Sequence, residues 1–154
     1  MNCQKGIPFN FANFGTNPYG KNLIGIAHYA SPRDGCSSLK PIDFTKDYEY
    51  EFMTSPIVVV DRGNCTFVTK AINAQAIGAK IVLIVYDQPD NVEEYIMADD
   101  GRGSELTIPT IMVNSLDGNI IKQFLNSNNT NISQHVAFSV TFPMVNHQYS
   151  FNFG

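Results

Sequence analysis

The chain has 154 residues, enough for one domain with a buried core, and its 44% apolar and 16% charged residues are typical of a globular protein. A formal net charge of −4 and only ten scattered lysines and arginines argue against a nucleic-acid partner. No apolar run reaches the roughly eighteen residues of a membrane span, so we expect any membrane attachment to lie outside this chain. We expect one domain over residues 1–154 of a larger protein, with residues 143–154 as an arm leading into the next domain.

The first half of the chain alternates strand and helix patterns. Residues 23–29 are the first strand candidate, and the β-branched run at 57–60 predicts a short buried strand. A narrow stripe of mostly small residues at helical spacing follows over 67–79, with Thr66 as the N-cap. Residues 81–86 are apolar throughout, as expected of a strand covered on both faces. Strand, helix and strand in this order predict a βαβ unit with parallel strands.

The second half repeats this order more loosely. Residues 87–106 form a long acidic loop, of a length that is usually functional or mobile, and residues 108–113 predict another strand. Ser115 is a good N-cap for a second helix, and strict alternation over 136–142 predicts a half-buried antiparallel strand near an edge. The expected fold class is therefore α/β, with a βαβ core and two main flanking helices. The apolar positions of the second helix keep i, i+4, i+8 spacing: Leu116, Ile120 and Phe124.

A search for catalytic motifs finds none. The chain has no Gly-x-Ser-x-Gly elbow and no His-Glu-x-x-His helix, and it lacks a complete phosphate-binding Gly-x-x-x-x-Gly-Lys-Ser/Thr loop. Asp99-Asp100-Gly101 lacks the alternating acidic positions of a calcium loop. The histidines lie far apart in the sequence: His28, His135 and His147. We therefore expect no metal, no cofactor and no enzymatic activity.

The three cysteines allow one disulfide and one free thiol if the compartment is oxidising. Cys65 lies at the start of the predicted helix, and a helix N-terminus lowers the pKa of a thiol. A small cysteine hydrolase with Cys65 as nucleophile is therefore the remote alternative. Against it, Cys36 offers Cys65 a bridge partner, and a bonded sulfur cannot attack a substrate.

The junction between the buried strand and the first helix is the candidate binding site. The backbone N–H groups of residues 64–67 have no partners within the helix, and α/β sheets place ligands at this edge. Arg62 could add a charged fork for a carboxylate or a peptide carbonyl. A purely structural alternative stays open: Gly63 makes the turn, Arg62 pairs with the acidic loop, and Cys65 fastens the loop.

Residues on both sides of this junction continue a specific pattern. They are Val60-Asp61-Arg62-Gly63-Asn64-Cys65-Thr66-Phe67, Lys70, Asn73-Ala74-Gln75, Gly78-Ala79, Ile108-Pro109-Thr110 and Leu116-Asp117-Gly118. This combination resembles the signature of protease-associated (PA) domains, which implies a PA-like sheet or open barrel. PA domains are non-catalytic modules of some proteases, membrane-anchored RING ubiquitin ligases, signal-peptide-peptidase-like proteins and vacuolar sorting receptors.

The N-terminal flank is most similar to the vacuolar sorting receptors. It contains Asn13-Phe14-Gly15-Thr16-Asn17-Pro18-Tyr19-Gly20 and Leu23-Ile24-Gly25, which resemble the segment that opens their PA domain. This resemblance implies that the junction binds the sorting peptide of soluble cargo through Arg62, Gly63, Asn64, Cys65, Thr66 and Phe67. A second contact of that family, a Thr-Met-Asp run, corresponds here only to Met97 and Asp99.

Three Asn-x-Ser/Thr sequons occur, at Asn64, Asn128 and Asn131. A sequon matters only in a secreted chain, where Asn128 and Asn131 become the candidate glycosylation sites. Asn64 stands where the plant receptors usually carry Asp, which removes one charge from the cargo loop. A glycan there would obstruct binding, so we expect Asn64 to be unmodified.

The resemblance predicts a lumenal receptor fragment from the Golgi, endosomal or vacuolar membranes. Its partner would be a peptide segment of a soluble cargo protein, and its membrane attachment a span outside this chain. The alternative within the same fold is the PA domain of a ubiquitin ligase or a protease, which would capture substrates or regulate the enzyme.

Overall fold

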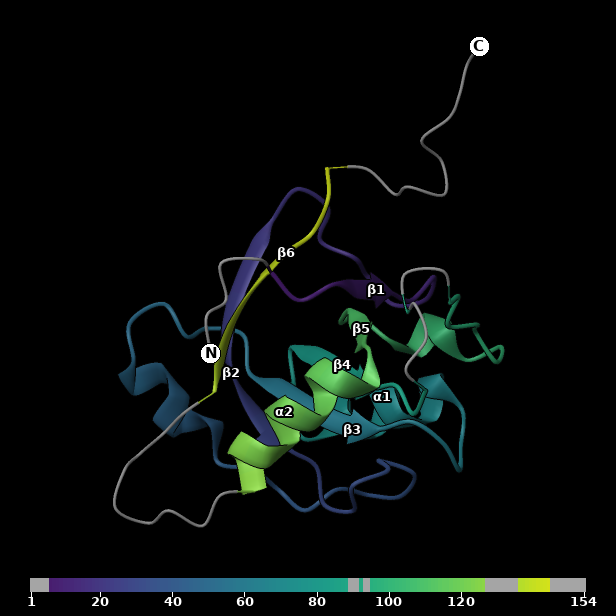
Figure 1. Ribbon diagram of the computed structural model, residues 1–154, viewed down its shortest axis with the longest axis horizontal. Coiled ribbons are helices and arrows are strands. Elements are labelled where there is room, and N and C mark those ends of the chain that lie inside the picture. The colour runs from purple at the N-terminus through teal and green to yellow at the C-terminus, as the bar shows by residue number, and fades with distance from the viewer. Residues whose placement is uncertain (1–5, 89–91, 93–94, 127–135, 145–154) are drawn as a thin grey trace.

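The computed structural model describes residues 6–88, 92, 95–126 and 136–144 (Figure 1). Its elements in chain order are β1 (Phe9–Phe11), β2 (Asn22–Tyr29), the 3-10 helix η1 (Phe44–Glu49), β3 (Ile57–Asp61), α1 (Phe67–Ala76), β4 (Ile81–Val85), the 3-10 helix η3 (Gly103–Glu105), β5 (Thr110–Val113), α2 (Ser115–Asn126) and β6 (Ala137–Thr141). These strands form one six-stranded sheet in the order β1-β5-β4-β3-β2-β6.

The sheet is parallel at its centre and antiparallel at its edges. Strands β2, β3, β4 and β5 run parallel to one another, with Ile57 opposite Ile81 in the central pair. The edge strands β1 and β6 pair antiparallel with β5 and β2. The sheet curls, so that the ring of Phe9 in β1 lies 6.0 Å from that of Phe142, just after β6. The predicted α/β class, the βαβ unit and the antiparallel edge position of β6 are confirmed.

Two clusters of buried side chains cover the two faces of the sheet. On β3, Val58 and Val60 pack with Val68 of α1, while Ile57 and Val59 pack with Ile121 of α2. Because successive side chains of a strand point to opposite faces, a fully apolar strand needs cover on both sides. The helices supply this cover, which explains why the central strands are apolar throughout.

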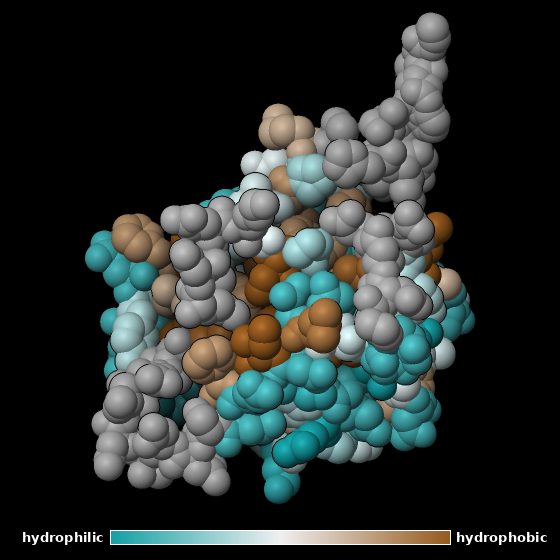
Figure 2. Space-filling model, in the orientation of Figure 1, coloured by the Kyte–Doolittle hydropathy of each residue, from teal (hydrophilic) through white to brown (hydrophobic). Residues whose placement is uncertain are grey.

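The second helix contacts the sheet through a different face from the one that carries its regular apolar spacing. Gly118 and Ile121 are buried, and a Cβ at Gly118 would lie 2.3 Å from the side chain of Val85. Gly118 therefore allows close packing on β4. Figure 2 shows apolar side chains along the centre of this face, where Figure 1 places α2. The residues at i, i+4, i+8 spacing are largely exposed: Leu116 (67%), Ile120 (40%) and Phe124 (44%).

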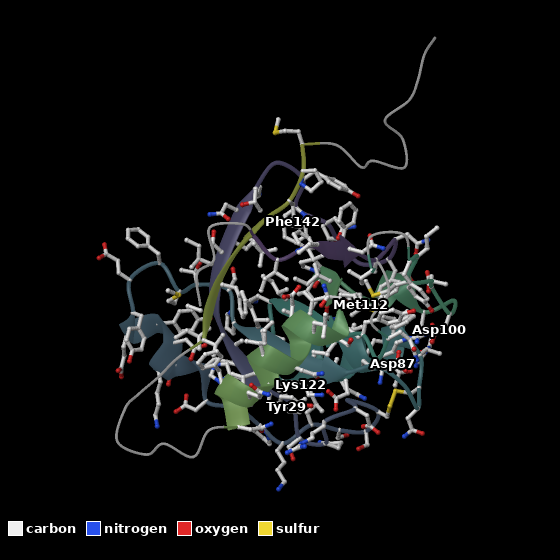
Figure 3. The ribbon with its side chains drawn as sticks, viewed as in Figure 1. Tyr29, Asp87, Asp100, Met112, Lys122 and Phe142 are labelled. Atoms are coloured by element: carbon white, nitrogen blue, oxygen red, sulfur yellow. A yellow bond between two sulfur atoms is a disulfide. The ribbon has the colours of Figure 1, made fainter. Side chains whose placement is uncertain are left out.

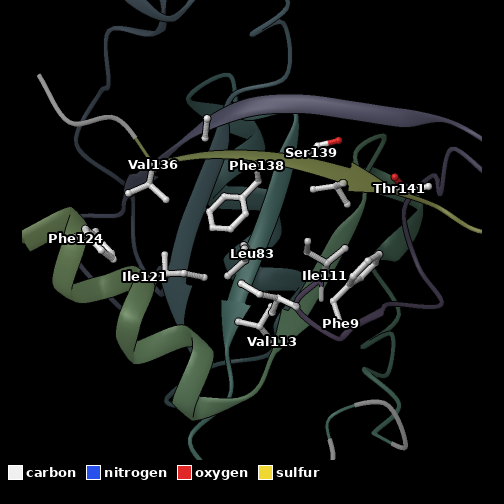
Figure 4. A pocket seen from close by; sticks show the side chains of 14 residues that line it. Phe9, Leu83, Ile111, Val113, Ile121, Phe124, Val136, Phe138, Ser139 and Thr141 are labelled. Atoms are coloured by element: carbon white, nitrogen blue, oxygen red, sulfur yellow. The ribbon is translucent and has the colours of Figure 1, made fainter. Parts of the chain in front are cut away.

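An apolar groove of about 650 Å³ opens between α2, β6 and β1 (Figure 4). Phe138 projects into it from β6, and Leu83 and Ile111 lie on the sheet beneath. Its lining offers two side-chain hydroxyls, and those of Ser139 and Thr141 both donate to Asn22 Oδ1, at 2.8 and 3.0 Å. The groove therefore has few free polar groups with which to orient a ligand.

Three elements were not predicted from the sequence: β1, η1 and η3, the last of which lies within the predicted acidic loop. Phe9–Phe11 forms β1, because residues 111–113 of β5 provide a backbone to pair with. Between β2 and β3, η1 is fixed by Asp43, whose carboxylate accepts the Thr45 N–H at 3.1 Å. Helix α1 also ends earlier than the predicted residue 79, since Gly78 adopts a φ of 101°.

Gly25→Ala is expected to lower the free energy of unfolding by about 3 kcal/mol, at the upper end of overpacking effects. A Cβ at this position would lie 1.6 Å from the carbonyl oxygen of Ser55, whose backbone is held by an N–H bond to Ile24 O at 3.0 Å. Urea denaturation measures the change. Gly6→Ala is the control, because a Cβ there meets nothing within 4 Å. Equal stability of the two variants would contradict this account of the close approach.

Candidate functional site

The junction between β3 and α1 is a tight turn followed by a capped helix. Gly63 and Asn64 both adopt left-handed backbone conformations, with φ of 108° and 71°. Thr66 then caps α1, as predicted, by accepting the Thr69 N–H at 3.1 Å. Within the described part of the chain, the N–H groups of Asn64, Cys65 and Phe67 donate to no acceptor. The turn thus presents free backbone donors beside a helix N-terminus, where anionic and carbonyl groups bind well.

Arg62 lies at the base of this turn and is held from several sides. Its guanidinium donates to Asp87 Oδ1 at 2.7 Å and to Tyr95 Oη at 3.0 Å. The same group lies 4.9 Å from the ring centre of Tyr86 and 5.0 Å from that of Tyr95. Burial alone lowers the pKa of Arg62, but its hydrogen bonds to Asp87 and Tyr95 raise the pKa above the ordinary value. The pairing of Arg62 with the acidic loop, which the purely structural alternative predicted, is present.

A hollow of about 530 Å³ lies over the junction, between the turn and the acidic loop. Figure 3 shows Asp87 and Asp100 at this end of the molecule, near the disulfide. The hollow is lined by backbone groups, aromatic rings and carboxylates, from the following residues: Arg62, Gly63, Cys65, Thr66, Phe67, Asp87, Tyr95, Ala98, Asp99 and Asp100.

The acidic loop is fastened to the start of α1. Thr66 Oγ1 donates to Asp100 Oδ2 at 2.7 Å, and Arg102 bonds the same oxygen at 2.7 Å. Asp99 Oδ1 accepts the N–H groups of Gly101 and Gly103, at 2.9 and 2.8 Å, so it shapes the loop. The hydrogen bond from Arg102, and then that from Thr66, lower the pKa of Asp100 to about 2.

The contact of Asp100 with Thr66 and Arg102 is expected to persist to about pH 3. A depressed carboxyl pKa favours the folded contact above the ordinary value of 3.8, and this preference is lost as the pH falls through about 2. An NMR titration of the Asp100 carboxyl carbon should give a midpoint near 2. In Arg102→Ala, which removes the largest cause of the shift, the midpoint should rise toward 3.8. A wild-type midpoint at 3.8 would contradict the contact.

The residues that the sequence singled out do not all reach the hollow. Asn64 does not line the hollow, and its side chain donates from Nδ2 to Asp34 Oδ2 at 3.0 Å. Met97 is 0% exposed and belongs to the core beneath the loop. Asp99 is exposed at the rim. Met97 can therefore support the loop, but its side chain is not at the surface.

A disulfide joins the turn to the segment after β2. Cys36 and Cys65 are bonded, with their Cα atoms 5.7 Å apart. Cys65 therefore carries no thiol in this form, which argues against the cysteine hydrolase. Lys70 of α1 lies fully buried below the bond and donates to the carbonyl oxygens of Asp34, at 2.6 Å, and of Gly63, at 2.5 Å. Two loops are thus held together by one covalent bond and one buried amine.

Other candidates from the sequence lie elsewhere. His28 bonds the buried Asp47 of η1 at 2.9 Å, and neither residue lines the hollow. The described residues contain no group of three or more His, Cys, Asp or Glu side chains placed to hold a metal ion. Outside the described residues lie Cys3, Asn128, Asn131, His135, His147 and the arm at 145–154.

Sequence reasoning did not single out Tyr86 and Tyr95, which hold Arg62. A signal for Tyr86 was present, because it directly follows β4 at the carboxyl edge of the sheet, where ligand sites form. Tyr95 lies inside the acidic loop, 33 positions from Arg62, and only the fold brings the two together.

The family model of the PA domain matches residues 23–121, from the start of β2 into α2. The chain belongs to the PA domain family. The match spans both the junction and the acidic loop, so the hollow lies within the matched PA domain. The recognition from sequence is confirmed, as is the PA-like fold.

Known proteins similar to this PA domain include receptors and RING-type membrane proteins. Vacuolar-sorting receptor 7 of Arabidopsis thaliana is 36% identical over 124 residues, which cover 74% of this chain and 18% of the receptor. The receptor homology region, transmembrane domain- and RING domain-containing protein 2 of the same plant is 32% identical, over 73% of this chain and 24% of that protein. The chain thus spans about a fifth of the length of these relatives.

Solved structures support the fold alone. An aminopeptidase from Aneurinibacillus sp. strain AM-1 superposes with a TM-score of 0.57 at 16% identity, covering 88% of this chain and 28% of the enzyme. Among the described residues, no helix combines the length and the apolar character needed to cross a membrane.

Proposed function

We propose that this PA domain binds an extended peptide segment of a soluble cargo protein in the hollow between the β3–α1 turn and the acidic loop. The observation that carries the proposal is the set of N–H groups at Asn64, Cys65 and Phe67, which have no acceptor among the described residues and lie beside a fixed Arg62. An extended peptide presents carbonyl oxygens at regular spacing, and these oxygens can accept hydrogen bonds from such N–H groups.

The surroundings of these donors suit a peptide better than a small anion. Phe67 and Tyr95 pack edge to face, with ring centres 6.0 Å apart, and give the hollow an apolar wall. Asp99 and Asp100 add two carboxylates to the lining of the hollow. Backbone donors, an apolar wall and a charged rim together can read the main chain and one or two side chains of a ligand. In this proposal Gly63 keeps the turn open, and Met97 supports the loop from below.

The likeness to vacuolar-sorting receptors supports a role in protein sorting. In that role the domain is a non-catalytic, lumenal part of a membrane receptor of the secretory pathway, anchored by a span outside this chain. Asn128 and Asn131 would then be accessible to glycosylation in the lumen.

A second candidate function rests on the RING-type relatives, which match almost as large a share of this chain as the receptors do. In that case the same hollow would capture a substrate for a membrane-anchored ubiquitin ligase. The sequence of the full-length protein separates the two: EGF-like repeats after this segment favour the receptor, and a RING domain favours the ligase.

A display selection with random linear peptides tests peptide binding directly. Wild-type protein is expected to enrich a family of sequences. Arg62→Ala loses the guanidinium that lines the hollow and should not enrich the same family. The synthetic form of the best sequence is then titrated against both proteins by calorimetry. Failure of the wild type to enrich any peptide, or equal enrichment by Arg62→Ala, would contradict the proposal.

A further inference from the structure

The Cys36–Cys65 bond places its two sulfurs in different surroundings. Cys65 lines the open hollow, where a solute can reach it. The sulfur of Cys36 instead lies 3.5 Å from Nζ of Lys70, an amine with no exposed surface. Lys70 also donates to two backbone carbonyls, which suits its protonated form. Both cysteines are half-buried, but Cys65 is the one that lines the hollow, and the sulfur of Cys36 lies against the buried amine of Lys70.

We propose that Cys36–Cys65 is a thiol-exchange site: a small thiol attacks Cys65, and Cys36 leaves as a thiolate held by Lys70. Thiol–disulfide exchange proceeds faster when the leaving sulfur is the better stabilised thiolate, and a nearby ammonium supplies that stabilisation. The substrate class is a low-molecular-weight thiol or dithiol.

The exchange is balanced with a dithiol as reductant. Its first thiolate forms a bond to the sulfur of Cys65, and the bond to Cys36 breaks with its electron pair on Cys36. The second thiol of the reagent, once deprotonated, attacks the mixed disulfide, and Cys65 leaves as a thiolate that takes up a proton. The reagent becomes a cyclic disulfide, and the protein gains two electrons.

The other charged groups near Cys36 are either partly screened or farther away than Lys70. The carboxylate of Asp34 accepts the Cys36 N–H at 3.0 Å, but it is partly exposed and also bonded to Asn64. The carbonyl oxygens of Asp34 and Gly63 lie 3.5 and 3.6 Å from the sulfur, and each already accepts a hydrogen bond from Lys70. Burial lowers the pKa of Lys70 below its ordinary value, while the charges of Asp34 and, at longer range, Asp61 raise it. Lys70 is therefore the full charge in direct contact with the sulfur.

Exchange at this bond has a consequence for the hollow, and this consequence rests on the proposed function. Opening the bond removes the covalent link between the segment after β2 and the turn that carries the donor groups of Asn64 and Cys65, and leaves only hydrogen bonds between them. A peptide seated in the hollow would cover the sulfur of Cys65. Reduction should thus weaken peptide binding, and a bound peptide should slow reduction by the same coupling.

Trapping the first step with glutathione tests which sulfur is attacked. Native wild-type protein is incubated with glutathione, quenched with acid and mapped by mass spectrometry. The expected adduct is glutathione on Cys65 with Cys36 free. Glutathione found mainly on Cys36, or equally on both residues, would overturn the proposal. Protein unfolded in urea is the control, and there both adducts should form.

The role of Lys70 is tested by alkylating the fully reduced protein with iodoacetamide between pH 5 and 10. The pH midpoint for Cys36 is expected about one unit below the ordinary value of roughly 8.5, and Lys70→Met should return it to that value or above, whereas Lys70→Arg should not. A wild-type midpoint at 8.5, or one unchanged by Lys70→Met, would overturn the assignment. These two measurements need no peptide. Their outcome therefore tests the exchange proposal even if the domain binds no peptide.

Discussion

Replacing Cys36 and Cys65 together with alanine is expected to lower the free energy of unfolding by about 3.5 kcal/mol. The bond joins positions 29 residues apart, and in the chain-entropy account a closed loop of this size removes that much freedom from the unfolded chain. Urea denaturation of the oxidised wild type and of the double variant measures the difference.

Cys3→Ala is the matched control for this experiment, because Cys3 takes no part in the bond. It should leave the urea midpoint unchanged. A loss below about 1 kcal/mol in the double variant would show that Lys70 and the surrounding packing already hold the two loops together without the disulfide.

Arg62→Ala is expected to weaken peptide binding by about 10- to 100-fold, the effect of losing roughly 1.4 to 2.8 kcal/mol. The substitution removes both hydrogen bonds that join the turn to Asp87 and Tyr95, and with them the stacking on Tyr86. Arg62→Lys should restore little, since an ammonium cannot reproduce a planar fork held between aromatic rings. Calorimetric titration with the best peptide from the display selection measures both variants.

The control for Arg62 is Arg33→Ala. Arg33 also stacks on an aromatic ring, with its guanidinium 5.3 Å from the ring centre of Tyr29, but it does not line the hollow. The Arg33→Ala variant should bind the peptide as tightly as the wild type does. An equal loss in Arg33→Ala and Arg62→Ala would point to general electrostatic attraction rather than a specific site.

The central part of the fold could be predicted because its signals are local. Three apolar runs, each too short for a helix and bounded by turn residues, identified β3, β4 and β5. Strand β1 has only three residues and exists because β5 offers it an edge, so its own sequence carries little information. The buried face of α2 was also hidden, since Gly118 packs against the sheet by lacking a side chain.

The candidate site could be predicted only in part, for a related reason. The Arg62–Phe67 motif identified the turn and the cap, because these depend on neighbouring residues. Cys36 lies 29 positions before Cys65 and was considered as its partner because the chain has only three cysteines. The aromatic cage around Arg62 depends on the fold bringing Tyr86 and Tyr95 to the junction, and no local sequence pattern predicts that placement. Met97 shows the opposite error: a position inferred from resemblance proves to be part of the core.

The most direct test of the central claim is an amide NMR titration of the wild-type domain with the selected peptide. It locates the ligand without altering any residue. We expect the largest shift changes at the N–H groups of Asn64, Cys65 and Phe67, with smaller ones at Tyr95 and Asp99 in the acidic loop. Changes concentrated instead on α2 and β6, around Ile121 and Phe138, would place the peptide in the apolar groove and contradict the proposed site.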